Sequence, residues 1–320
     1  MMRAVISLIA AALVLPACLA PAYAGDSAKD WLDRMSAAMS QMTYQGTFVY
    51  IQGDQMETMR ITHVSGENGV QERLVSLTGT PRELLRDADG VRWSLGAGGA
   101  VLADRGFGQT FFPALPTDYA GEAGRSYTLK MGEQTLIAGH QARHVKVLPR
   151  DRYRYGYSLW LEKHSGLLLK WVLLDSASKP LAKLMFTDLK LGSAVDKNEL
   201  KPGKGMSSME PVDSSLPAGG LAQKTPPRWH PERLPPGFSL TTHRYLESEA
   251  YEHLVYSDGL AAVSVYVESV GSARGHPEIT QQHGTTHVFT RAADDLLVTV
   301  VGNVPAVTVQ MIGKSVAASR

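Results

Sequence analysis

The sequence predicts an α+β protein that is rich in β-structure and folds as two domains. Three observations support this prediction. Between Tyr44 and Leu191, short apolar and β-branched runs are separated by turn residues, which is typical of hairpins. One amphipathic helical pattern precedes these runs. A stretch rich in Pro, Gly and Ser then separates them from a second, shorter β-rich segment.

Residues 1–24 have the features of a secretory signal peptide. Arg3 precedes an apolar run, and Ala22 and Ala24 frame an A-x-A cleavage site. The run is too short, and too soon interrupted by prolines, to suit a membrane-spanning helix. We therefore expect cleavage after Ala24 and export of the mature chain.

Cys18 is the one cysteine of the sequence, and it lies within the predicted signal. Removing 24 residues from 320 leaves 296 without a thiol, which excludes a disulfide framework. An alternative takes "LPAC" as a lipobox that makes Cys18 an acylated N-terminus, but Pro16 fits it poorly. Loss of Arg3 reduces 32 Lys and Arg to 31, equal to the 31 Asp and Glu, so we expect no nucleic acid partner.

A helix is predicted over 28–42. Ser27 can cap its first turn, and Asp30 follows three residues later. Apolar residues recur at three- and four-residue spacing, namely Trp31, Met35, Met39 and Met42. This stripe is either ordinary core packing or, because methionine adapts to irregular partners, a lipid-contacting surface.

Strand patterns then follow one another through the rest of the first domain. They cover 44–52, 56–64, 70–77, 91–95, 101–104, 127–131, 135–137, 143–148, 150–162, 167–174 and a last pair around 181–191. Connections this short cannot form parallel crossovers, so the sheet should be antiparallel. A sheet of about ten strands curls. We therefore expect an N-terminal curled, open half-barrel with helices, whose concave face is lined by apolar rows.

Residues 201–227 hold five Pro, four Gly and four Ser in 27 positions, which indicates a flexible linker. It divides a first domain over 25–200 from a small second domain over 228–320. The second domain has strand patterns over 238–245, 252–256, 260–268, 282–291 and 296–302. Pro305 then suits the first turn of a helix. This order predicts a small antiparallel sheet with one packed helix.

The stretch from 150 to 162 shows the longest alternation. Its period of two predicts a strand with an aromatic and apolar face, Tyr153, Tyr155, Tyr157 and Leu159, and a cationic face, Arg150, Arg152 and Arg154. The aromatic row either packs in the core or lines a cleft that faces lipid, because a buried tyrosine must satisfy its hydroxyl. The arginines either pair with acidic side chains across strands or contact an anionic group of a ligand or partner.

Motifs for catalysis or metal binding are scarce. His140 with His144 and His283 with His287 have a metal-like spacing, but on one strand such residues stand about 13 Å apart, too far for a shared ion. The sequence has no nucleophile elbow, zinc-protease helix or phosphate loop. We expect no cofactor and no metal, and nothing supports an enzyme.

Four longer stretches resemble a known family. "PRDRYRYGYSLWLEKHSGLLLK" from Pro149 and "LMFTDLKLG" from Leu184 resemble the RseB/MucB family, periplasmic regulators of the sigma-E envelope-stress response. In the second domain, "VYSDGLAAVSVYVE" from Val255 and "LLVTVVGNVP" from Leu296 resemble the counterpart stretches in the expected order. The resemblance covers essentially the whole mature chain.

This resemblance implies both a fold and a function. The first domain would be similar to the lipoprotein carriers LolA and LolB. The chain would bind the periplasmic segment of a membrane-anchored, RseA/MucA-type anti-sigma factor and shield it from the first regulatory protease. Lipid or lipopolysaccharide would release that partner. The family likeness also implies self-association.

The partner contact is predicted in the second domain at Tyr256, Ser257, Asp258 and Gly259, although Ser257-Asp258-Gly259 is equally a hairpin turn. A periplasmic carrier of lipid or lipoprotein is the alternative function, because the first domain alone would suit it. The linker and the extra sheet favour the regulator, since a carrier needs neither.

Overall fold

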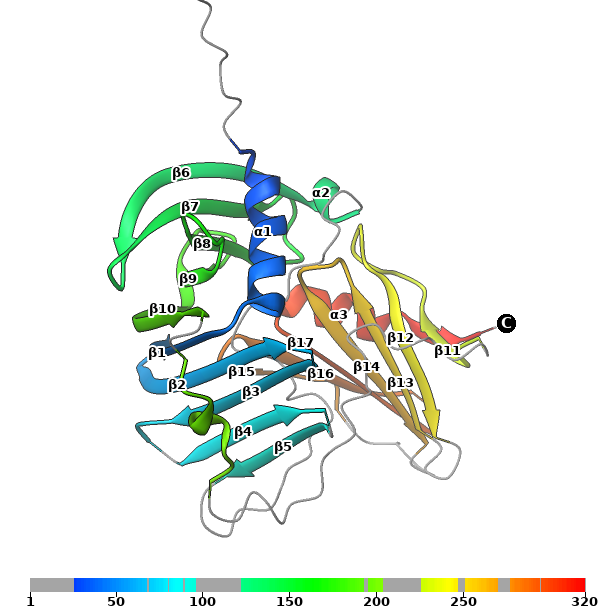
Figure 1. Ribbon diagram of the computed structural model, residues 1–320. Helices are drawn as coiled ribbons and strands as arrows, with labels where there is room; N and C mark the ends of the chain where they lie inside the picture. Colours follow the sequence, from blue (N-terminus) through cyan, green and yellow to red (C-terminus); the bar gives the residue numbers. More distant parts are fainter. Residues whose placement is uncertain are drawn as a thin grey trace, which may run out of the picture.

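The computed structural model describes residues 26–319, except 68, 80, 89, 96–121, 193–194, 204–225, 247–250, 270–276 and 294. The predicted signal peptide, the strand predicted over 101–104 and most of the predicted linker lie outside these residues. Figure 1 shows a large curled sheet beside a smaller one. Within the described part of the chain, no helix has the length and apolar character needed to cross a bilayer.

The first domain is one sheet of ten strands with every neighbouring pair antiparallel, in the order β5-β4-β3-β2-β1-β10-β9-β8-β7-β6. Its strands are β1 (Tyr44–Gln52), β2 (Gln55–Gly66), β3 (Gly69–Ser76), β4 (Arg82–Asp87), β5 (Gly90–Leu95), β6 (Tyr127–Ile137), β7 (His140–Pro149), β8 (Gly156–Glu162), β9 (Leu168–Leu174) and β10 (Pro180–Leu191). The described part of this domain also has two short helices, α2 (Glu122–Ser126) and the 3-10 helix η2 (Lys197–Leu200). The sheet is open, because β5 and β6 are its edges.

The helix α1 (Ala28–Gln41) packs on the inner face of this sheet (Figure 1). Ser27 and Asp30 form the predicted capping box, with the Ser27 amide donating to Asp30 at 2.8 Å. The hydrogen bonds from Ser27 lower the pKa of the Asp30 carboxyl. The helix buries Leu32 and Met35, which are 2% and 1% exposed, in the same core as the strands. The methionine stripe therefore contributes to ordinary core packing.

Strand alternation fixes which side chains form that core. Val145, Leu159 and Leu184 belong to three different strands, point inward and are fully buried. Phe48 packs edge-on against Phe186, with ring centroids 5.6 Å apart. The inner face is thus covered by the domain's own helix and side chains.

The second domain is a six-stranded antiparallel sheet in the order β12-β13-β14-β17-β16-β15. Its strands are β12 (Ser239–Leu246), β13 (Tyr251–Ser257), β14 (Ala262–Ser269), β15 (Ile279–His283), β16 (Thr286–Ala293) and β17 (Leu296–Gly302). The helix α3 (Ala306–Lys314) packs on one face through Val309 and Ile312, both fully buried. β11 (Trp229–Pro231) and β18 (Val316–Ala318) form a separate two-stranded sheet.

The predicted fold class is confirmed, although several element boundaries differ. The segments predicted over 127–131 and 135–137 form one strand, β6, with a bulge between Met131 and Gln134. The pair predicted around 181–191 is the single strand β10. The strand predicted over 282–291 is a hairpin of β15 and β16, because Gly284 turns the chain with a φ of 62°.

We predict that Leu159→Ala lowers the free energy of unfolding of the first domain by about 2–5 kcal/mol, because it opens a cavity in a closely packed core. Urea unfolding followed by tryptophan fluorescence measures this change. Leu136→Ala is the matched control, because Leu136 is 64% exposed on β6. The control should change stability by less than about 0.5 kcal/mol. Equal effects of the two substitutions would contradict the burial of Leu159.

Candidate functional site

The connection between β7 and β8 departs from the predicted strand. β7 ends at Pro149 and β8 begins at Gly156, so residues 150–155 are irregular. The Asp151 carboxylate accepts hydrogen bonds from the Tyr153 amide at 2.9 Å and from Arg154 Nε at 3.1 Å. Such local side-chain bonds compete with strand pairing. The expectation that Arg150, Arg152 and Arg154 share one strand face is therefore wrong.

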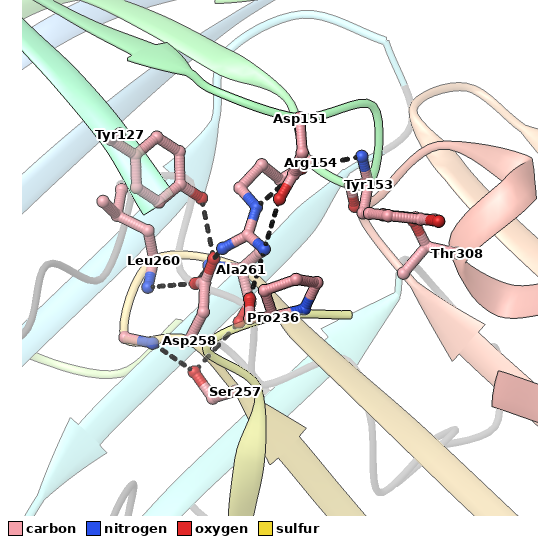
Figure 2. A network of polar contacts seen from close by, with 11 residues as sticks. Tyr127, Asp151, Tyr153, Arg154, Pro236, Ser257, Asp258, Leu260, Ala261 and Thr308 are labelled. Carbon is pink, nitrogen blue, oxygen red and sulfur yellow. Dashed lines mark hydrogen bonds and ion pairs between the residues drawn. The ribbon is translucent and has the colours of Figure 1, made fainter. Parts of the chain in front are cut away.

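Arg154 instead turns inward and is 1% exposed (Figure 2). One of its terminal nitrogens forms an ion pair with Asp258 of the second domain. The other donates to Asp151 Oδ2 at 2.9 Å and to the Pro236 carbonyl at 2.6 Å. The guanidinium also lies 5.4 Å from the ring centroid of Tyr127. One buried cation thus contacts groups from both domains.

Asp258 receives these bonds at the tip of the β13–β14 hairpin. Its Oδ1 accepts from the amides of Leu260 at 2.9 Å and Ala261 at 2.7 Å. Its Oδ2 faces Arg154 and accepts from the Tyr127 hydroxyl at 3.0 Å. The turn includes Gly259 at a φ of 95°, a conformation that favours glycine. These hairpin bonds orient the carboxylate through contacts within the second domain itself.

The electrostatics of this cluster keep Arg154 charged. Burial opposes the charge on its guanidinium, but hydrogen bonds and charges of Asp151 and Asp258 outweigh burial and raise its pKa. Burial, with a further contribution from the charge of Asp258, raises the pKa of Tyr127 well above its ordinary value. Tyr127 thus stays a neutral hydrogen-bond donor at physiological pH. The cluster is suited to holding two domains together.

Further contacts join the two domains around this ion pair. Thr308 of α3 donates from its hydroxyl to the Tyr153 carbonyl at 2.6 Å. The Tyr155 hydroxyl lies 3.4 Å from His287 Nδ1. Leu260 belongs to the second domain by sequence but packs within the core cluster of the first. We call residues 150–155, Tyr127 and the Asp258–Ala261 turn, with the groups they contact, the domain contact.

The structure divides the predicted lipid-facing row between two environments. Tyr153 and Tyr155 lie in the domain contact. Leu159 is fully buried in the core of the first domain, and Tyr157 packs partly buried against it. Burial raises the pKa of Tyr155 to about 12. The four residues therefore do not form one continuous strand face.

The three arginines are separated as well. Arg154 is buried in the domain contact, whereas Arg150 and Arg152 are exposed. Arg150 Nε donates to the Tyr127 carbonyl at 3.2 Å, and the Arg152 guanidinium lies 5.5 Å from the ring centroid of Tyr153. Neither forms an ion pair with any residue that the structure describes. Two of the three charges thus stay at the rim of the domain contact.

The predicted partner-binding residues lie in the core and the β13–β14 turn of the second domain. Tyr256 is 4% exposed and belongs to the core of the second domain. Ser257 accepts from the Gly259 amide and donates to the Ala261 carbonyl, both at 2.9 Å, within the hairpin turn. Asp258 lies in the domain contact. Of the histidine pairs, His283 and His287 lie on two strands of a hairpin, which corrects the prediction of one strand.

Two family models match the chain in succession. They are the MucB/RseB N-terminal domain, over residues 27–204, and the MucB/RseB C-terminal domain, over residues 223–317. The chain belongs to the MucB/RseB family. Among curated relatives, the chain is 33% identical over 304 residues to the sigma factor AlgU regulatory protein MucB of Pseudomonas aeruginosa, which covers 92% of each chain. The sigma-E factor regulatory protein RseB of Haemophilus influenzae is 27% identical over 300 residues, 91% of each.

Solved structures of the MucB/RseB family match both domains together. A crystal structure of MucB in complex with MucA(peri) covers 92% of this chain and 100% of the matched one, at a TM-score of 0.73 and 31% identity. A crystal structure of MucB covers 91% and 98%, at a TM-score of 0.66 and 31% identity. The two-domain architecture is therefore shared with these relatives.

Sequence reasoning missed several members of the domain contact. Tyr127, Asp151 and Thr308 carry no motif, and each makes its contact across a long stretch of chain or within an irregular turn. The available signal was "PRD" from Pro149 to Asp151, because proline and aspartate are both common turn residues.

We predict that Asp258→Ala destabilises the protein by about 3–5 kcal/mol, because it leaves the buried Arg154 without its partner in the second domain. Thermal and urea unfolding measure the loss. Small-angle scattering should show a larger radius of gyration if the domains separate. Asp54→Ala, in the exposed β1–β2 turn, is the matched control and should change stability by less than about 0.5 kcal/mol.

Replacing both partners tests whether the charge pair itself is required. Arg154→Met with Asp258→Asn should recover part of the loss, because both charges of the pair are gone while the asparagine side-chain oxygen still accepts from the Leu260 and Ala261 amides. Tyr127→Phe removes one hydrogen bond and should cost about 1 kcal/mol. An Asp258→Ala variant as stable as the control would contradict the assigned role of this pair.

Proposed function

We propose that this chain is a non-catalytic periplasmic regulator that binds the periplasmic segment of an anti-sigma factor of the RseA/MucA type. The supporting observation is the likeness of both domains, over 92% of this chain, to MucB in complex with MucA(peri). The curated relatives are named as regulatory proteins of sigma factors. The predicted signal peptide supports export.

The rim of the domain contact is the proposed site for this partner. Arg150 and Arg152 are exposed there without an ionic partner among the described residues. Exposed guanidinium groups bind carboxylates in a bidentate geometry. An acidic partner segment bound at this rim would touch both domains. The Tyr256–Gly259 stretch would then affect partner binding indirectly, by holding its hairpin in the domain contact, because Tyr256 and Asp258 are themselves buried.

Protection and release follow from the same arrangement. A partner segment covered by the protein is inaccessible to a protease. The proposed signal, a lipid or lipopolysaccharide, would contact Tyr153 and Tyr155 of the predicted row, because Leu159 is fully buried in the core. Tyr153 and Tyr155 now contact the second domain, so an acyl chain there must displace that domain. Lipid and partner would then weaken each other's binding by the same factor.

The alternative of a lipid or lipoprotein carrier has less support. A carrier needs an apolar surface that is available to cargo, whereas Leu159 is fully buried and Tyr155 is 7% exposed. The second domain also contacts Tyr153 and Tyr155 of the predicted lipid-facing row. The regulator accounts for both domains, and the carrier accounts for one.

We predict that Arg152→Glu weakens binding of the cognate anti-sigma segment at least tenfold, because it places a like charge against an acidic partner. Isothermal titration with the purified periplasmic segment measures the dissociation constant. Lys179→Glu makes the same charge change on the exposed β9–β10 loop and should leave affinity within about twofold. Equal losses in both variants would contradict a site at this rim, and no binding to the wild type would overturn the proposed function.

Lipid should compete in the same titration. Saturating lipopolysaccharide should raise the dissociation constant of the anti-sigma segment and expose that segment to protease. An affinity that is unchanged at saturation would remove the lipid signal from the proposal and leave partner binding intact.

A further inference from the structure

The outer face of the ten-stranded sheet carries two cross-strand rows that the proposed function does not use. The first, which we call the lysine row, runs through directly paired residues on seven strands: Lys130, Lys146, Ser158, Val172, Lys183, Ile51 and Met56. The second, the tryptophan row, runs through six strands: His144, Trp160, Lys170, Met185, Val49 and Thr58. Together they form the outer-face patch.

Alternation places these rows on the side away from α1. The row between them contains Val145, Leu159 and Leu184, which are fully buried in the core that includes α1. Successive residues of a strand point to opposite faces. The two rows therefore face outward, where Met56 and Met185 are 67% and 39% exposed.

The patch carries charge of one sign. Its four lysines and one histidine are accompanied by no acidic residue in either row. Lys130 stands directly opposite Lys146, an arrangement that repels. None of the four lysines forms an ion pair with a residue within the described ranges. The two rows therefore carry four lysine charges with no acidic side chain among their own members.

Stacked side chains form the centre of this patch. The His144 ring stacks on Trp160 with centroids 4.3 Å apart and planes 2° apart. Lys170 Nζ lies 4.4 Å from the Trp160 ring centroid. Gly132 leaves room for the histidine, because a Cβ there would lie 2.4 Å from His144 Nδ1. His144 Nε2 is buried, and no described residue forms a hydrogen bond with it.

We propose that the outer-face patch docks the protein on the surface of a bilayer that contains anionic phospholipid. Lysine attracts anionic headgroups, and tryptophan with methionine can enter the interfacial region. The lysines of the lysine row lie on strands from β6 to β10, which are separated by four gaps, a span of about 19 Å at the usual strand spacing. Charges spread so widely match a field of headgroups better than a single phosphate, for which donors would converge.

The lowered pKa of His144 supports a positive electrostatic potential at the patch. Burial and the nearby charges of Lys146 and Lys170 lower the pKa of the imidazole. A layer of anionic headgroups over the patch would offset those lysine charges. The pKa of His144 should therefore rise on the membrane, which gives a local readout at the patch itself.

We test the proposal by co-sedimenting the mature protein with vesicles of phosphatidylcholine alone or with 30% phosphatidylglycerol. Binding should require the anionic lipid and fall in high salt. Lys146→Gln, Lys170→Gln and Lys183→Gln together should weaken it about a hundredfold, since each lysine near an anionic surface contributes about a factor of five. The matched control replaces Lys163, Lys179 and Lys201, which lie in turns and loops, by glutamine.

The control variant has the same net charge and should bind vesicles within a few-fold of wild type. Equal loss in both triple variants would show a general charge effect and overturn the proposal. Absence of wild-type binding to the anionic vesicles would do the same. Binding to lipopolysaccharide micelles or to an acidic peptide, without binding to phosphatidylglycerol vesicles, would also overturn it.

A second measurement does not depend on how tightly the variants bind. In NMR titrations, the pKa of His144 should rise when bicelles that contain phosphatidylglycerol are added, and it should not rise with phosphatidylcholine alone. Lys146→Gln with Lys170→Gln should raise that pKa without any lipid, because two repelling charges are gone. If the pKa of His144 does not change when anionic bicelles are added, docking through this face is contradicted.

Discussion

The buried ion pair between Arg154 and Asp258 is the interaction on which the two-domain arrangement depends. Charged groups removed from water are tolerated only when they are paired and hydrogen-bonded. Here each partner meets that requirement from both domains: Arg154 through Asp151 and the Pro236 carbonyl, and Asp258 through Tyr127 and its own hairpin amides. Separating the domains would leave both charges poorly paired. The pair therefore links the position of the second sheet to the conformation of a short connection in the first.

This arrangement gives the two faces of the large sheet different chemistry. The inner face is apolar, is covered by α1 and ends at the domain contact. The outer face presents lysines around a stacked histidine and tryptophan. The domain contact includes Tyr127, which is buried in the core on the inner side of the sheet, whereas the outer-face patch lies on the other side. A partner bound at the one and a membrane bound at the other would therefore not compete. In the proposed arrangement, this protein would bind its partner while it stays at a membrane.

Much of the fold could be predicted because local pattern and tertiary burial agree. β1 and β17 occupy the predicted residues, and the Ser27 capping box begins α1 where the pattern indicates. β4 was missed because the adjacent residues Leu84 and Leu85 are both buried, which removes the period-two signal. The candidate site was harder. Its tyrosines and arginines were identified as notable residues, but their grouping assumed a strand that the Asp151 turn interrupts.

The sequence by itself determined the fold class, the family and the division into a large and a small sheet, because these depend on periodicity, turns and long matching stretches. Tertiary structure alone decided which of three arginines is buried, and that the tip of the β13–β14 hairpin meets the first domain. Those outcomes rest on pairing between residues about a hundred positions apart, such as Arg154 and Asp258. A local sequence pattern cannot predict such a pairing. The interaction becomes strong only when both domains have folded and water is excluded from between them.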